Sequence, residues 1–89
     1  MKPERLAILE SSLTDIQDAL DTLQEVRDEE EEAYDNLPES IQYSEKGDMM
    51  QDAIDNLDDA IGSIEEAADT LETVTVDAAD ELVQEIDAL

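Results

Sequence analysis

Almost every side chain of this sequence that can take part in chemistry is a carboxylate. Asp and Glu number 28, Lys and Arg number 4, and His and Cys do not occur. The usual general base, the nucleophilic thiolate and most transition-metal ligands are therefore missing. No segment fits the ligand spacing of an EF-hand loop, and none resembles a P-loop or a dinucleotide-binding fingerprint. We expect a protein that is not an enzyme and that has no cofactor and no metal site.

The carboxylates form two ladders, in which acidic residues recur at alternating steps of three and four and therefore share one face of a helix. The first ladder consists of Asp18, Asp21, Glu25, Asp28, Glu32 and Asp35. The second consists of Asp48, Asp52, Asp55 and Asp59, and it resumes at Glu66 and Asp69. Neighbouring acids lie ~5 Å apart along a helix axis, and DNA carries one phosphate per ~3.4 Å of each strand. The ladders predict a rod that fits a basic groove made for a nucleic-acid backbone.

A solvated surface is the alternative interpretation of these ladders, because any helix whose polar positions are mostly Asp and Glu shows this spacing. Like charges four residues apart destabilise a helix by a few tenths of a kcal/mol. That the sequence tolerates so many such pairs indicates selection for negative charge itself. Solubility and adaptation to high salt explain that selection as well as mimicry does.

A second candidate site lies where the sequence gathers its rare residue types. Tyr34, Tyr43 and Lys46 are close together, and Ser44 stands at the start of a predicted helix. Free backbone N–H groups, a helix dipole and a lysine can together hold a phosphate, so these four residues are a candidate ligand pocket. In the alternative interpretation the segment is a structural corner, in which the tyrosines fill the end of a helix pair and Gly47 eases the turn.

The elements that must position these residues are helices. Leu6, Leu9, Leu13, Ile16, Leu20 and Leu23 follow the spacing of a coiled-coil seam. No Gly or Pro occurs in residues 4–35, so we predict a helix over about 4–35. Pro3 would lie in its first turn, and Ser11 or Ser12 is an alternative start. A connector follows at 36–45, in which Asn36 and Glu39 form a capping box at the start of a short helical turn.

A second seam runs from Met50 to Leu71 and predicts a helix over about 46–72. The run TVTV at 73–76 is β-branched and weakens a helix. We therefore predict a short last helix over about 76–88, capped by Thr75, although one continuous, kinked helix is the alternative. Its apolar face would consist of Val76, Ala79, Val83 and Ile86.

Together these elements predict a single all-α domain over 1–89, an antiparallel helical hairpin with a short third C-terminal helix. Two helices bury only a narrow stripe each, and a formal charge of −24 opposes compaction. We therefore expect a homodimer or a higher oligomer that forms a bundle. Its stability should rise with salt, because salt screens the repulsion.

The segments AYDNLPESIQYSEKG and MMQDAIDNLDDAIGSIEEA resemble small uncharacterised acidic helical proteins of Firmicutes phages and mobile elements. Those proteins combine an NLPES(L/I)Q…SE(R/K)G connector with an AI..L..AI helix, and the resemblance covers about 30–68. It implies no established activity. The genetic setting of the family implies an anti-defence role, such as DNA mimicry against nucleases and CRISPR effectors.

The leading prediction is a non-catalytic acidic binding protein that occupies a basic, nucleic-acid-binding surface of a host protein as a DNA mimic in the cytoplasm. The negative charge disfavours direct binding of nucleic acid or of an anionic membrane, and no apolar run approaches the ~20 residues of a membrane span. Two alternatives stay open. One is an oligomeric sponge that sequesters a nucleotide immune signal, and the other is a structural helical module.

Overall fold

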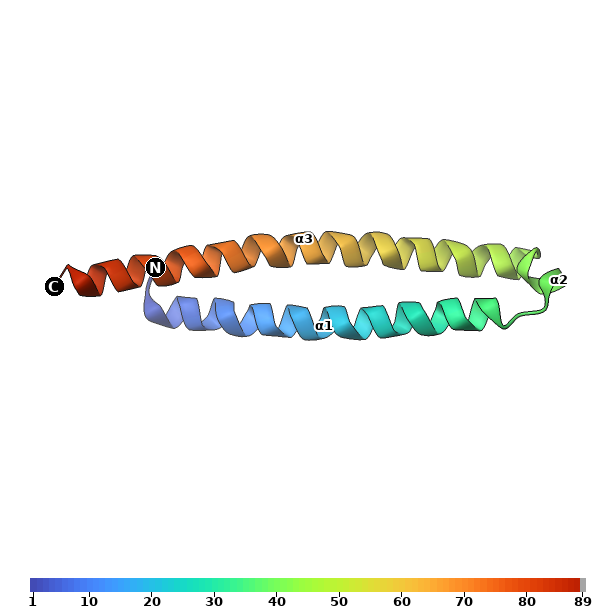
Figure 1. Cartoon of the computed structure of the whole chain (residues 1–89), viewed down its shortest axis with the longest axis horizontal. Coiled ribbons are helices and arrows are strands. Elements are labelled where there is room, and N and C mark those ends of the chain that lie inside the picture. The colour runs from blue at the N-terminus through green and yellow to red at the C-terminus, as the bar shows by residue number, and fades with distance from the viewer. Residues whose placement is uncertain (89) are drawn as a thin grey trace.

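The computed structural model describes residues 1–88, which fold into helices. Helix α1 spans Pro3–Asp35, α2 spans Glu39–Gln42 and α3 spans Glu45–Asp87. The two long helices lie side by side and run in opposite directions, with α2 at the corner between them (Figure 1). The Cα atoms fill a rod of 71 × 15 × 14 Å. The prediction of an all-helical chain is confirmed.

Helix α1 begins at Pro3, where the missing N–H is harmless because the first N–H groups of a helix have no partner inside it. The alternative start at Ser11 or Ser12 is not used, and the Ser12 hydroxyl donates to the Ile8 carbonyl inside the helix at 2.8 Å. The predicted capping box of Asn36 and Glu39 does not form. Pro38 is the N-cap residue of α2, and its extended backbone starts that helix at Glu39.

Helix α3 continues through residues 73–76, so the predicted end near 72 and the separate helix over 76–88 are wrong. Thr75 is a buried interior residue and not a cap, and its hydroxyl donates to the Glu72 carbonyl at 2.7 Å. Thr73 donates in the same way to Asp69 at 3.2 Å. β-Branched residues lower helix propensity by less than ~1 kcal/mol each, and packing of the apolar face outweighs that cost.

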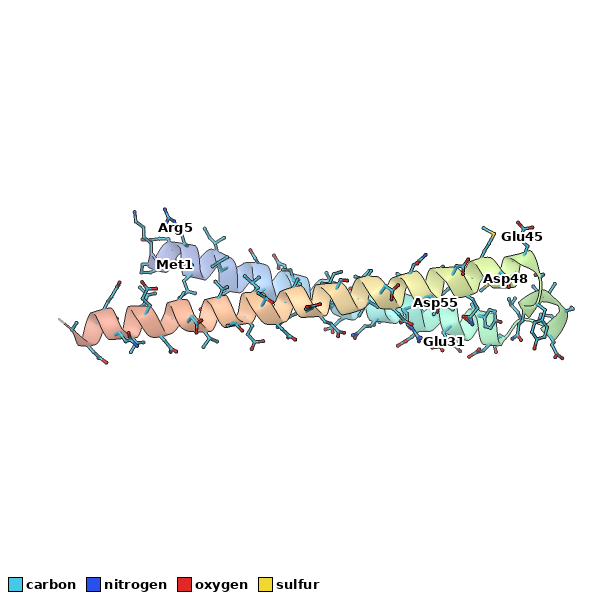
Figure 2. The ribbon with its side chains drawn as sticks, turned by 90° about the horizontal axis from the view of Figure 1, so that it is seen from above. Met1, Arg5, Glu31, Glu45, Asp48 and Asp55 are labelled. Atoms are coloured by element: carbon cyan, nitrogen blue, oxygen red, sulfur yellow. The ribbon has the colours of Figure 1, made fainter. Side chains whose placement is uncertain are left out.

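The core is a single seam between α1 and α3. Leu20, Ile61 and Ala68 are buried at its centre, and Leu13 and Ile16 are among the residues that pack against them. On α3 the seam keeps its steps of three and four without interruption, through the following positions: Gly47, Met50, Ile54, Leu57, Ile61, Ile64, Ala68, Leu71, Thr75, Ala78 and Leu82. A repeat of 3.5 residues makes paired helices coil around each other, and the two ribbons cross in Figure 2.

The apolar face predicted for the end of α3 is largely exposed. Val76, Val83 and Ile86 are 52%, 56% and 68% accessible to solvent. The reason is the uninterrupted seam, because it turns Thr75, Ala78 and Leu82 toward α1 and leaves the neighbouring row outside.

Candidate functional site

Two polar contacts between α1 and α3 fix which sides of the two helices share a face. Gln24 Nε2 donates to Glu65 Oε1 at 3.1 Å, and Arg27 Nε donates to Asp58 Oδ1 at 2.7 Å. Gln24, Glu65 and Asp58 each lie four residues after a buried seam residue. Residues that lie four positions after a seam residue, and that are not in the seam themselves, therefore share one face of the rod. We call it the acidic face.

Both predicted ladders run along the outer edges of the rod and border the acidic face. The ladder residues of α1 and of α3 are all exposed. At ~100° per residue, every acid of α3 from Glu45 to Glu72 falls on the acidic face or on the outer edge beside it. Figure 2 labels Asp48 and Asp55 among the side chains that project from α3. Sequence spacing alone thus located the ladders, and the pairing of the helices places one on each edge of the same face.

Arg27 is the cation that links the two helices across the acidic face. It takes the α1 seam position after Leu23, and its side chain is only 23% exposed. Besides Asp58, it contacts Glu31 and Asp28. The hydrogen bond to Asp58 raises the pKa of the Arg27 guanidinium, burial opposes this effect, and Glu31 adds to it. Sequence reasoning missed this contact, although the spacing of the seam places position 27 at the interface.

The structure does not gather the four predicted pocket residues into one cavity. Tyr43 is 79% exposed, and Ser44 is the N-cap of α3, where its hydroxyl accepts from the Gly47 N–H at 3.5 Å. Tyr34 is half-buried. Lys46 lines an open hollow of ≈ 460 Å³, whose other lining residues are Glu30, Glu45, Met49, Met50 and Ala53.

The corner is instead held together by hydrogen bonds from a side chain to backbone carbonyl groups. Gln42 Nε2 donates to the carbonyl oxygens of Tyr34 at 3.0 Å and Asp35 at 3.5 Å in the last turn of α1, and the Tyr34 carbonyl also accepts from the Leu37 N–H at 3.0 Å. Gly47 is buried, and a Cβ atom there would overlap the Gln42 carbonyl. The glycine at position 47 is therefore explained by a close approach of α3 to α2. Sequence reasoning missed the role of Gln42.

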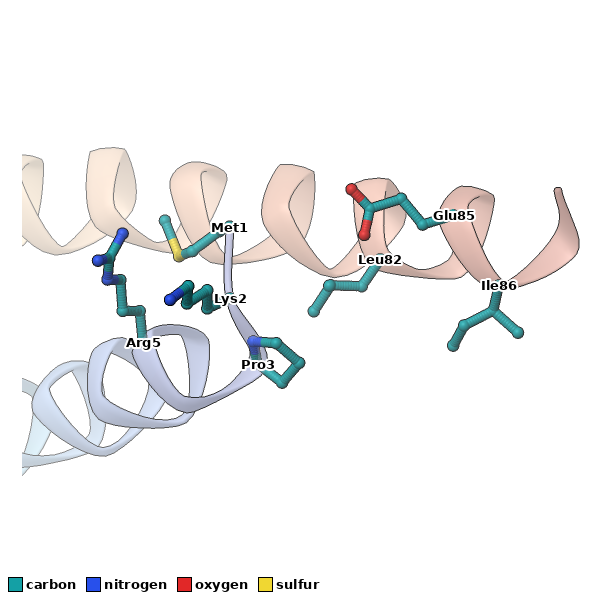
Figure 3. Close-up of a pocket in the computed structure, with 7 residues that line it drawn as sticks. All are labelled: Met1, Lys2, Pro3, Arg5, Leu82, Glu85 and Ile86. Carbon is teal, nitrogen blue, oxygen red and sulfur yellow. The ribbon is translucent and has the colours of Figure 1, made fainter. Parts of the chain in front are cut away.

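A larger open hollow of ≈ 830 Å³ lies at the opposite end of the rod, where α3 extends past the start of α1. It is lined by Met1, Lys2, Pro3, Arg5, Leu82, Glu85 and Ile86, shown in Figure 3. The Met1 amino group lies 3.4 Å from Glu81 Oε1 beside it. The lining mixes aliphatic side chains with charges of both signs, without the few convergent polar groups that orient a ligand.

Comparisons with protein-family models, with curated proteins and with solved structures found no match to this chain. Over residues 1–88, no helix is long and apolar enough to cross a membrane. In the same range, no three carboxylates come together in an arrangement that could hold a metal ion. The functional argument therefore rests on how charge is distributed over the rod.

Proposed function

We propose that this chain is a non-catalytic binding protein whose acidic face and edges occupy the basic, nucleic-acid-binding surface of another protein. The observation that carries the proposal is its linear charge density. A net charge of −24 is spread over a rod 71 Å long, which is about one charge per 3 Å. DNA carries one phosphate per ~3.4 Å along each strand and one per ~1.7 Å when both strands are counted, so the whole rod has about the charge density of one strand.

The position of the ladders supports the same proposal. They border one face on both sides, as two phosphate strands border a groove of DNA, and helices hold their spacing fixed. Among the ladder carboxylates of the described chain, only Asp28 lies within ion-pair distance of a cation, at 3.4 Å from Arg27. The other ladder carboxylates are available to the Lys and Arg side chains of a partner. Such a partner would also be drawn in quickly by long-range attraction.

The resemblance carried by the NLPES connector supports an anti-defence setting. In that setting the partner is a nuclease or another nucleic-acid-binding protein in the cytoplasm of the host cell. The chain would work there as a self-associating helical hairpin that forms a bundle.

Charge neutralisation tests the proposal. The immobilised chain is exposed to a bacterial lysate at low salt, and captured proteins are eluted with double-stranded DNA. We expect basic proteins that elute with DNA and that bind at least tenfold more weakly at ~0.5 M salt. The test variant neutralises one ladder by Asp21→Asn, Glu25→Gln, Asp28→Asn and Glu32→Gln. The control removes the same charge at the end of α3 by Asp77→Asn, Asp80→Asn, Glu85→Gln and Asp87→Asn.

The ladder variant should lose the captured proteins, whereas the control should retain most of them. Equal loss in both variants would show that only overall charge matters, and capture that is insensitive to salt would contradict mimicry. The nucleotide sponge gains no support from the single chain, because the hollow beside Lys46 includes Glu30 and Glu45, which repel a phosphate. A nucleotide that raises the melting temperature of the chain would support the nucleotide sponge instead.

A further inference from the structure

The side of the rod opposite the acidic face carries almost no charge. It is built from residues that lie three positions after a seam residue and that are not in the seam themselves. They lie on the far side of the seam from Gln24 and Glu65. On α1 these residues are Ser12, Ala19, Val26 and Ala33. On α3 they are Ala53, Ala60, Ala67 and Val74. We call this side the uncharged face.

The neighbouring row of α3 is uncharged as well, and consists of Met49, Asn56, Ser63 and Thr70. Between Met49 and Val74, therefore, this side of α3 bears no acid in a chain that has 28 of them. Met49 and Val74 are 67% and 41% exposed, and Val26 of α1 is 47% exposed. Packing of α1 against α3 does not explain the segregation, because these side chains lie outside the seam.

The exposed area of the chain matches an uncovered interface. The molecule exposes 6439 Å², whereas a compact chain of 9.9 kDa exposes roughly 5,200 Å². The excess is on the order of 1,200 Å² for each copy, which is more than the ~800 Å² that each partner buries in a standard protein interface. In addition, no side chain among residues 1–88 is completely buried. One helix pair therefore lacks a full core.

The charges at the two ends of the uncharged face indicate what covers it. The α3 row of Ala53 and Ala60 is preceded by Lys46 at the corner end and followed by Glu81 at the open end. These two residues are ~52 Å apart at ~1.5 Å per residue. If a second copy of this chain covers the uncharged face and runs in the opposite direction, the Lys46 of each copy lies near the Glu81 of the other. A second copy that runs the same way brings the two Lys46 side chains together at the corner end. At the open end Glu81 already contacts the Met1 amino group at 3.4 Å, so the corner end decides the direction.

We propose that a second copy of this chain covers the uncharged face, related by a two-fold axis that passes near Ser63 and reverses the direction of the rod. The four long helices then form a bundle whose two acidic faces point outward on opposite sides. The same register brings the corner of one copy, with the exposed Tyr43, to the level of the α3 overhang of the other. The proposal does not depend on the function of the acidic face.

Sedimentation velocity of the full chain tests the interface. We expect a dimer whose dissociation constant falls as salt rises, because salt screens repulsion between two highly negative copies. This sign is opposite to that expected for a basic partner, so the two proposals fail separately. Ala60→Glu places a charge in the interface twice and should raise the dissociation constant at least about a hundredfold. Gln51→Glu adds the same charge on the acidic face and should leave the dimer intact.

A wild-type chain that stays monomeric at ~0.1 mM in ~0.5 M salt would overturn the proposal. Ala60→Glu and Gln51→Glu chains that dissociate equally would also overturn it.

Crosslinking tests the direction of the second copy in folded protein and does not depend on the Ala60 variant. The sequence has no cysteine, so Lys46→Cys and Glu81→Cys each give a unique thiol. With a short bis-maleimide, we expect crosslinked dimers only when the two variants are mixed, linking one of each. Crosslinking of the Lys46→Cys variant with itself would show that the copies run the same way and would overturn the proposed arrangement.

Discussion

Arg27 Nε on α1 lies 2.7 Å from Asp58 Oδ1 on α3, at a seam position where the preceding turns of α1 carry leucine or isoleucine. The apolar seam of α1 thus gives way to a charged contact on the side of the corner. In a chain with four basic residues, this one cation neutralises part of the acidic face and fixes the alignment of the two helices.

Arg27→Gln should lower the melting temperature, because Asp58, Glu31 and Asp28 then face each other without a cation. The loss should shrink at high salt, which screens the remaining repulsion. Arg5→Gln removes the same charge at the open end and is the matched control. Thermal unfolding at low and high salt measures both variants. Equal losses for the two would show that the Arg27 contact adds nothing beyond net charge.

The two glycines should respond to alanine in opposite directions. Gly47→Ala should destabilise the fold by about 1–3 kcal/mol or more, because its methyl group would overlap the Gln42 carbonyl. Gly62→Ala should stabilise it by about 1 kcal/mol, because nothing lies within 4 Å of a Cβ atom there and alanine is the better helix former. Urea unfolding measures both free energies. A stable Gly47→Ala variant would be incompatible with the close approach of α3 to α2.

Gln42→Ala should lower the free energy of unfolding by about 1 kcal/mol, because it removes the side-chain donor to the Tyr34 and Asp35 carbonyls at the end of α1. Gln17→Ala, at an exposed position of α1, is the control and should change little. Amide hydrogen exchange should localise the effect to the corner. Faster exchange along the whole of α1 would argue against a local capping role.

Thr75→Val distinguishes a continuous α3 from a helix that starts at Thr75. In the continuous helix the change replaces a buried hydroxyl by a methyl group in the seam, and stability should rise by up to about 1 kcal/mol. If Thr75 were an N-cap, the same change would cost about 1 kcal/mol. Thr73→Val lies at an exposed position and should be nearly neutral. The sign of the shift in thermal unfolding decides between the two.

The positions of the long helices were predictable because each element repeats one simple spacing many times. Leu6 to Leu23 and Met50 to Leu71 lie at the predicted seam, and Pro3 and Pro38 lie outside the helix interiors. The predicted break at Thr75 does not occur, because the seam continues on both sides of Thr75 and its packing outweighs the low helix propensity of β-branched residues. Gly47 and Gln42 could not be assigned from spacing, since their roles arise from contacts between separate elements.

The sequence by itself determined that the chain is helical, where its seam lies, and that its acids form ladders, because these properties depend only on residue type and helical periodicity. Tertiary structure decided which sides of α1 and α3 face the same way, because that depends on how two separate helices align. The pairing of Arg27 with Asp58 and of Gln24 with Glu65 puts both ladders at the borders of one face. The same pairing leaves the alanine-rich rows of the two helices together on the uncharged face.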